Sequence, residues 1–359
     1  MTIVLAAGGT GGHLFPAEAL CGALIARGHK VVVMTDKRST GYGEIFPGAE
    51  IAIVPSAAFS DRSVFGLMMA PFEILAGIAV SFGKLKALKP SAVVGFGGYP
   101  SVPVMLAACL AGLPTAILSP DALLGRANRL LMNYVKAIAA NFKLVRFLPR
   151  HPEKIVYTGN PLRPEVIALS RAPYDVSADT IRILVFGGSQ GARVFSERVP
   201  DAIDRLPDDL KRRLAIVQQC RPEDLEGVRQ VYERMGVKAE LAPFFKDMPA
   251  QIAKAHLVIA RSGAGTVSEL ACIGRPAILV PLPHALDDNQ TPNAEALVAV
   301  GGGWRLPQKD FTPEKLAQML TEAFADMAGL SAKAAAALTL AKPNATRALA
   351  DLVEKLEGA

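Results

Sequence analysis

A histidine that follows a cluster of glycines near the start of the chain could do acid–base chemistry beside a bound anion. The segment reads Gly8-Gly9-Thr10-Gly11-Gly12-His13. Glycines expose backbone amides and allow close approach, and amides at a helix N-terminus bind anions or polar sugars. A proton on His13 is disfavoured at the positive end of a helix, so we expect a neutral imidazole that can accept one. The alternative is that His13 only caps the helix.

The flanking residues predict the elements that position this histidine. Residues 2–7 form a short apolar run, as expected for a strand buried on both faces of a parallel sheet. Residues 14–27 place apolar side chains at helical spacing. The glycine spacing departs from the dinucleotide-binding fingerprint, and no acidic residue ends the next strand in a clear ribose position. An NAD-dependent oxidoreductase is therefore the less favoured interpretation of this strand, glycine loop and helix.

The alternation of strands and helices continues along the chain in two blocks. Further strands of the first block are expected at 30–35, 51–54, 92–95, 115–118, 137–140 and 155–158. This block also has a second glycine loop at 95–100 and a helix at 102–111. Strands of the second block are expected at 181–186, 257–260 and 276–281, with glycine loops at 187–191 and 261–266 and a helix at 267–273. A linker at 159–164 separates the blocks.

This pattern predicts an α/β protein with two Rossmann-like doubly wound domains that face each other across a cleft. Ligands bind at the carboxyl ends of the strands in such folds, where all the glycine loops would open. The expected domains are residues 1–162 and 163–342, and a final helix within 343–359 is expected to return to the first domain.

Composition limits the functions that this chain can have. Its 359 residues, 51% of them hydrophobic, are enough for two domains with full cores. The net charge of +6 suits anionic ligands or an anionic membrane surface. No nucleic acid is expected, because no basic block is interleaved with aromatic residues. The cysteines are far apart and suit reduced thiols of a cytosolic protein, and no signal peptide is expected before the first strand.

Residues 64–82 form an unusually apolar stretch. Its length permits a membrane span, but Pro71 and Glu73 argue against one. An interfacial helix that dips into anionic lipid fits the pattern better. The expected membrane patch comprises Leu75, Ile78, Phe82 and Leu85 with Lys84 and Lys86. The alternative is a core helix with a solvated basic end.

Several of these motifs together resemble a known family. They are Gly8–His13, Gly97-Gly98-Tyr99, Gly159-Asn160-Pro161, Gly187–Gly191, and Arg261–Ala264 followed by Thr266–Glu269. In this order they are similar to the MurG family of bacterial peptidoglycan N-acetylglucosaminyltransferases. The resemblance covers essentially the whole chain and implies the GT-B fold.

The resemblance also implies a reaction and its setting. N-acetylglucosamine would move with inversion from UDP-N-acetylglucosamine to undecaprenyl-pyrophosphoryl-N-acetylmuramyl-pentapeptide, which makes lipid II. The chain would act peripherally at the cytoplasmic face of the bacterial inner membrane, with cell-wall and division proteins as possible partners. No cofactor and no metal are expected, and the sequence has no D-x-D motif near the glycine loops.

Inverting transfer needs a base on the acceptor hydroxyl and stabilisation of the leaving diphosphate. His13 is the expected base. By resemblance, Glu269 would bind the ribose, Phe245 would contact uracil and Arg163 would reach the donor. The full expected donor site is Thr10, Gly11, Gly12, Arg163, Gly188, Ser189, Gln190, Phe245, Ser262, Gly263, Ala264, Thr266, Glu269, Gln290 and Asn293. The expected acceptor site is Tyr99, Asp121 and Asn128.

One loop departs from the family pattern. Many members carry H-E-Q-N after the strand that corresponds to 115–118, whereas this chain has Ser119-Pro120-Asp121-Ala122. Asp121 is the only carboxylate left there and could orient His13 or the acceptor. The departure leaves three alternatives open: a transferase with reduced activity, a transferase with a different acceptor, or a UDP-sugar-binding protein that does not catalyse transfer.

Overall fold

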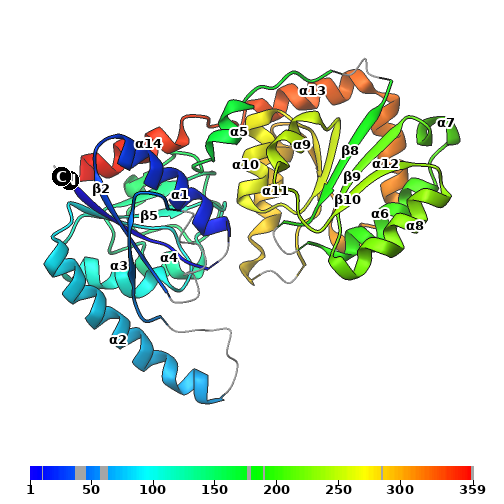
Figure 1. Cartoon of the computed structure of the whole chain (residues 1–359). Helices are drawn as coiled ribbons and strands as arrows, with labels where there is room; N and C mark the ends of the chain where they lie inside the picture. The colour runs from blue at the N-terminus through cyan, green and yellow to red at the C-terminus, as the bar shows by residue number, and fades with distance from the viewer. Residues whose placement is uncertain are drawn as a thin grey trace. The chain divides into compact units, whose positions relative to one another are not determined.

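The computed structural model divides the chain into two compact units, shown in Figure 1. Unit 1 contains Met1–Arg163 and Asn344–Ala359, and unit 2 contains Pro164–Pro343. These limits lie one residue from the expected ones. The structure describes all residues except 10, 37–45, 57–63, 176–178, 189–190, 284–285 and 357–359, and it does not describe the side chains of 64–71 and 286.

Unit 1 is built on a parallel seven-stranded sheet. Its strands are β1 Thr2–Ala6, β2 Lys30–Thr35, β3 Glu50–Ile53, β4 Ala92–Gly95, β5 Thr115–Ser119, β6 Ala137–Ala140 and β7 Ile155–Val156. They follow the order β3-β2-β1-β4-β5-β6-β7. The order reverses between β1 and β4, the position where doubly wound sheets bind ligands at their carboxyl edge.

Helices cover both faces of this sheet because alternate side chains of its strands are buried on opposite sides. The helices are α1 Gly11–Ala26, α2 Val64–Leu88, α3 Ser101–Leu110, α4 Arg126–Leu131 and α14 Ala345–Lys355. Ile3 and Leu5 of β1 belong to the core beneath α1 and α14, whereas Val4 belongs to the core that includes residues of α3 and α4.

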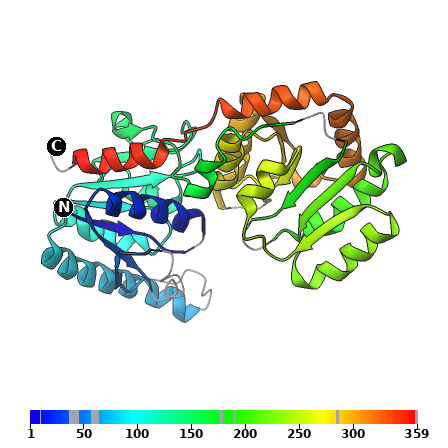
Figure 2. The ribbon, with the colours of Figure 1, turned by 45° about the horizontal axis from the view of Figure 1, so that its top comes forward.

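The final helix, α14, packs against α1, as Figures 1 and 2 show. Its Leu349 and Val353 are buried in the same core as Leu20 of α1. Arg27 and His29, which follow α1, each contact Glu354 at 2.8 Å. These contacts are partly exposed, so apolar burial contributes more to holding α14 than the ion pairs do.

Unit 2 repeats the arrangement with a parallel six-stranded sheet. Its strands are β8 Ile181–Phe186, β9 Leu214–Gln219, β10 Lys238–Ala242, β11 Leu257–Ala260, β12 Ala277–Leu279 and β13 Gly303–Arg305. Their order is β10-β9-β8-β11-β12-β13, so the reversal lies between β8 and β11. The helices are α5 Pro164–Ala168, α6 Arg193–Asp204, α7 Asp208–Lys211, α8 Leu225–Arg234, α9 Met248–Lys254, α10 Ala264–Ile273, α11 Gln290–Ala299, α12 Pro313–Ala325 and α13 Met327–Leu338.

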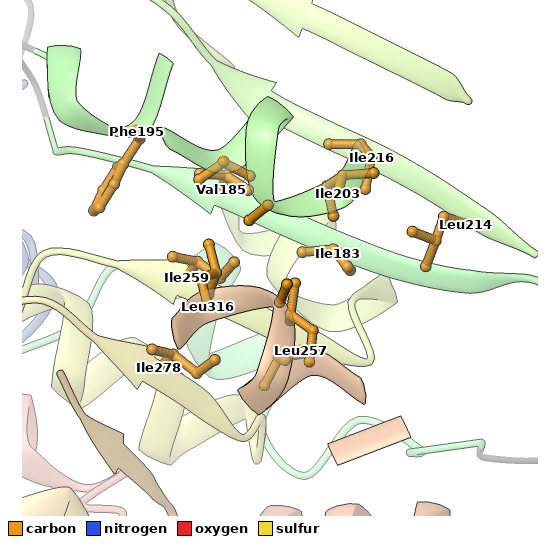
Figure 3. Packing of buried hydrophobic residues seen from close by; sticks show 14 of the residues in the cluster. Ile183, Val185, Phe195, Ile203, Leu214, Ile216, Leu257, Ile259, Ile278 and Leu316 are labelled. Carbon is orange, nitrogen blue, oxygen red and sulfur yellow. The ribbon is translucent and has the colours of Figure 1, made fainter. Parts of the chain in front are cut away.

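Side chains of the unit 2 core come from strands and helices far apart in sequence (Figure 3). Ile183 and Val185 of β8 pack with Phe195 of α6 and Leu316 of α12. Phe195 also meets Phe311 edge to face, with ring centroids 5.5 Å apart. This core fixes the carboxyl ends of β8 and β11, where the glycine loops of the unit begin.

The structure corrects part of the expected membrane patch on α2. Leu75 and Phe82 are exposed, with 63% and 40% of their surface accessible, and Lys84 and Lys86 are exposed beside them. Ile78 is partly buried against the core, and Leu85 is fully buried in it. Leu85 is therefore not a surface residue. In the described part of the chain, no helix is both long and apolar enough to cross a membrane.

Candidate functional site

The imidazole of His13 lies against the bare backbone of the loop that follows β4. α1 begins at Gly11, so His13 belongs to the first helical turn and does not occupy the capping position before it. Gly97 and Gly98 both have positive φ angles, of +85° and +73°. A Cβ atom would lie 3.2 Å from Cε1 of His13 if added at Gly97, and 3.4 Å from Cδ2 if added at Gly98. The two glycines therefore make the space that the ring occupies.

Burial lowers the pKa of His13 below the ordinary value of 6.5. Desolvation of the charged imidazolium is the largest cause. The negative charge of Asp121 and the backbone of Phe96 act in the opposite direction with smaller effects. This shift favours the neutral imidazole at pH 7, and burial is its largest cause. Its Nδ1 atom is buried.

The segment after β5 is held beside His13 by hydrogen bonds to its backbone. The buried Asn128 donates from Nδ2 to the carbonyl of Leu118 at 2.8 Å. Its Oδ1 faces Gly97, since a Cβ atom added to that glycine would lie 3.8 Å from it. Ser119 donates to the carbonyl of Leu123 at 3.2 Å. Asp121 is half-buried in this segment, and its charge acts on His13. The structure thus brings the predicted residues His13, Asp121 and Asn128 together.

The other predicted residues of unit 1 lie around the same edge of the sheet. Tyr99 is half-buried in the loop after β4. Gly11 and Gly12 occupy the first turn of α1, while Thr10 lies outside the described residues. Arg163, at the end of the unit, places its guanidinium carbon 4.9 Å from the ring centroid of Phe15 on α1. This stacking fixes Arg163 beside the helix that carries His13.

Unit 2 presents two helix N-termini at its own reversal point. α6 follows the loop after β8, and α10 follows the loop after β11. Neither N-cap residue, Ala192 or Gly263, makes a side-chain capping hydrogen bond. No N-cap side chain therefore competes with an anion for the first backbone amides of either helix. Gly188 lies in the first of these loops with φ of +85°, and the predicted Ser189 and Gln190 lie outside the described residues.

Three predicted donor residues fix the loop after β11 in place. Ser262 is fully buried and donates to the carbonyl of Gln290 at 2.8 Å. Asn293 is also fully buried and donates from Nδ2 to the carbonyl of Ser262 at 3.2 Å. Gln290 accepts from the amide of Leu282 at 3.0 Å. The buried Ser262 and Asn293 side chains thus hold the loop and present no exposed polar atom to a donor.

The remaining donor residues differ in accessibility. Ala264 is buried at the start of α10, whereas Thr266 and Glu269 are half-buried on the same helix. Phe245 is only 6% exposed, and the neighbouring Phe244 is 63% exposed. The more accessible ring of this segment is thus that of Phe244, and the contact of Phe245 with a base stays a prediction.

Sequence reasoning missed one residue at this edge of unit 2. Gln219, the last residue of β9, is 3% exposed. Its Oε1 accepts from the amide of Gly187 and its Nε2 donates to the carbonyl of Pro243, both at 3.1 Å. The sequence signal for this residue is the pair of glutamines at the end of an apolar run. Ligands bind at the carboxyl ends of the strands in this type of sheet, so polar residues there are candidates for the site.

The described residues include no cluster of three or more His, Cys, Asp or Glu side chains that could hold a metal ion. The geometry instead offers a neutral imidazole in unit 1 and uncapped helix N-termini in unit 2. A neutral imidazole can accept a proton from a hydroxyl group. Uncapped helix N-termini can stabilise a phosphate charge. These are the two requirements of a transfer from a nucleotide sugar.

Comparisons with known proteins agree with this geometry. Residues 3–140 match the glycosyltransferase family 28 N-terminal domain, and residues 182–353 match the glycosyltransferase family 28 C-terminal domain. A relative from Methylobacterium radiotolerans is 50% identical, covering 98% of this chain and 96% of that protein. One from Agrobacterium fabrum is 48% identical, covering 99% and 94%. Both are named UDP-N-acetylglucosamine--N-acetylmuramyl-(pentapeptide) pyrophosphoryl-undecaprenol N-acetylglucosamine transferase.

A solved structure extends the likeness to three dimensions. The crystal structure of Acinetobacter baumannii MurG matches with a TM-score of 0.82 and 31% identity, covering 99% of both chains. The two units therefore define a glycosyltransferase of the GT-B fold class. Within that class, the chain belongs to glycosyltransferase family 28 and, inside it, to the MurG N-acetylglucosaminyltransferases.

Proposed function

We propose that the chain transfers N-acetylglucosamine from UDP-N-acetylglucosamine to an undecaprenyl-pyrophosphoryl-N-acetylmuramyl-pentapeptide. The observation that carries the proposal is full-length similarity, at 48–50% identity, to proteins named for this reaction. The placement of His13 beside the Gly97-Gly98 backbone supports it.

His13 acts as the base in this proposal. Its Nε2 takes the proton of the acceptor hydroxyl while that oxygen attacks the anomeric carbon of the donor. The bond from this carbon to the diphosphate breaks, and its electron pair leaves with UDP. A single displacement of this kind inverts the anomeric centre. The neutral state of His13 at pH 7 supports the role, because only a neutral imidazole can accept the proton.

Unit 2 binds the donor in this proposal. The N-terminal amides of α10, from Gly263 to Thr266, stabilise the charge that grows on the diphosphate. Gly188 contacts the same group. Phe244 offers its exposed ring to the uracil, and Glu269 accepts hydrogen bonds from the ribose hydroxyls.

The acceptor places the reaction at a membrane surface. We propose that the chain works peripherally at the cytoplasmic face of the inner membrane, with Leu75 and Phe82 entering the lipid interface and Lys84 and Lys86 near anionic headgroups. The exposure of these side chains on α2 supports this. The proposed mechanism needs no cofactor or metal, because helix amides supply the stabilising charge. Cell-wall and division proteins are the expected protein partners.

Release of UDP tests the proposal. It should require both UDP-N-acetylglucosamine and a muramyl-pentapeptide diphosphate lipid analogue, supplied in detergent or liposomes. No release with this pair would count against the function. Release with a soluble aglycone alone would indicate a different acceptor.

The variant His13→Ala tests the role of the base. It should lower kcat by about two or more powers of ten and leave UDP affinity unchanged, because the UDP-binding loops belong to unit 2. Glu18→Gln, a change on the same helix, serves as the control and should keep near wild-type turnover. Equal rates in His13→Ala and wild type would remove His13 from the mechanism.

A further inference from the structure

One buried side chain connects the two segments of unit 2 that are proposed to bind opposite ends of the nucleotide. The first is the diphosphate loop, here Gly187 and Gly188, and the second is the base segment, residues 243–245. The carboxamide of Gln219 accepts from the amide of Gly187 at 3.1 Å and donates to the carbonyl of Pro243 at 3.1 Å. A single planar group thus joins one backbone donor to one backbone acceptor.

The strand order explains how one residue reaches both segments. β9 lies between β8 and β10 in the sheet. The diphosphate loop leaves the carboxyl end of β8, and the base segment leaves the carboxyl end of β10. Gln219 is the last residue of the middle strand, so its side chain projects between the two exits. Only Asn and Gln carry a donor and an acceptor on one neutral planar side chain.

Both backbone partners of Gln219 depend on it in this arrangement. Gln219 is only 3% exposed, and its two hydrogen bonds are each part-buried. An apolar replacement would leave the Gly187 N–H and the Pro243 carbonyl partly buried without this hydrogen-bond partner. A buried polar group that has lost its partner destabilises the fold more than an apolar group at the same position would. The neighbouring exposed ring of Phe244 would lose its anchored backbone at the same time.

We propose that Gln219 is a positioning residue that sets the separation of the diphosphate loop and the base segment to fit a nucleoside diphosphate. It touches no substrate itself. The inference rests on the proposed function in taking these two segments as the donor site. It goes further by assigning the fit between the two half-sites to one side chain on the strand between them.

The variant Gln219→Met tests this role because it keeps the length of the side chain and removes both hydrogen bonds. With the full chain, the Kd for UDP and the KM for UDP-N-acetylglucosamine should rise about tenfold or more, while the KM for the acceptor analogue stays unchanged. The affinity for UDP should fall more than that for uridine, since uridine does not need both half-sites to be spaced correctly.

The adjacent glutamine provides the matched control. Gln218 precedes Gln219 on the same strand and is fully buried, but its Oε1 accepts from the hydroxyl of Tyr232 at 2.7 Å. Gln218→Met should therefore lower the Tm by a similar amount and keep the Kd for UDP within about twofold of wild type. Thermal unfolding and calorimetric titration with UDP on the same samples separate a loss of stability from a loss of donor fit.

A second variant, Gln219→Glu, keeps the proposal testable if Gln219→Met does not fold. The carboxylate can accept from Gly187 but cannot donate to Pro243, so UDP binding should be weak at high pH. A protonated carboxyl group restores the donor. The Kd for UDP of the variant, divided by that of the wild-type chain at the same pH, should therefore fall toward one as the pH is lowered.

Three results would overturn the proposal. One is an unchanged Kd for UDP in Gln219→Met, and another is an equal loss of UDP affinity in Gln218→Met. The third is the absence of any recovery of Gln219→Glu at low pH. If the wild-type chain bound no UDP at all, the proposed function would fail and this inference with it.

Discussion

Replacing Gly97 by alanine should slow catalysis by displacing the ring of His13. The added Cβ would lie 3.2 Å from Cε1 and 3.3 Å from Nδ1 of the imidazole. Contacts this short force the ring to give way by a few tenths of an ångström. Since a misplacement of about 1 Å can cost about 100-fold in rate, a shift of this size corresponds to roughly a five- to tenfold fall in kcat.

The same substitution also strains the backbone, so a control must separate the two effects. A φ of +85° costs an alanine about 1–2 kcal/mol. Gly112 has a φ of +67°, but a Cβ added there would meet nothing within 4 Å. Gly112→Ala therefore carries similar backbone strain without any contact with His13.

Steady-state kinetics with saturating acceptor, together with thermal unfolding, distinguish the outcomes. Both variants should lose a few degrees in Tm, but only Gly97→Ala should lose kcat, and neither should change the KM for UDP-N-acetylglucosamine more than about twofold. Wild-type kcat in Gly97→Ala would refute the steric argument. An equal fall of kcat in Gly112→Ala would show that backbone strain, and not the ring, is responsible.

Other predictions concern charge, surface and core. Because burial lowers the pKa of His13, the kcat/KM of the wild-type chain should fall only as the pH drops below 6.5. The negative charge of Asp121 raises the pKa of His13, so the variant Asp121→Asn should shift this fall in kcat/KM to lower pH. Changing the exposed Leu75 to serine should weaken binding to anionic liposomes and leave the affinity for UDP unchanged. Leu85 is buried, so Leu85→Ala should instead lower the free energy of unfolding in urea by about 2–5 kcal/mol. Arg275 is 1% exposed, and its guanidinium donates to several backbone carbonyls. Arg275→Leu should therefore lower the free energy of unfolding in urea by about 3–5 kcal/mol. A loss below about 1 kcal/mol would contradict this account.

Apolar runs that end in glycine loops were enough to predict much of the fold. The strand predicted at 2–7 is β1 Thr2–Ala6, and the strand predicted at 181–186 is β8. The helix predicted to start at residue 14 begins at Gly11, because adjacent glycines suggested a loop where the backbone is already helical. β9, β10 and β13 were missed. β9 ends in two glutamines, and β10 is largely exposed at the sheet edge, so neither shows the continuous apolar run of a central strand.

The membrane patch shows the limit of helical periodicity as a guide. Leu75 and Phe82 lie seven residues apart and nearly eclipse each other on α2, and so do Ile78 and Leu85. The two pairs are offset by roughly 60° around the helix. The sequence pattern places all four residues on one broad face of the helix. It cannot show which of the two pairs faces the core. The structure shows that the Leu75 edge is exposed and that Leu85 is buried.

The chemistry of the site depends on a difference between two similar units. Each unit reverses its strand order between its first and fourth strands and places glycine-rich loops there. In unit 1 the first helical turn after that point carries His13, whose burial keeps it neutral. In unit 2 the corresponding loops carry Arg261, whose guanidinium is committed to the carbonyls of Val280 and Pro281. Among the described residues, the loops of unit 2 can therefore stabilise a phosphate through helix amides, and the proposed base, His13, belongs to unit 1.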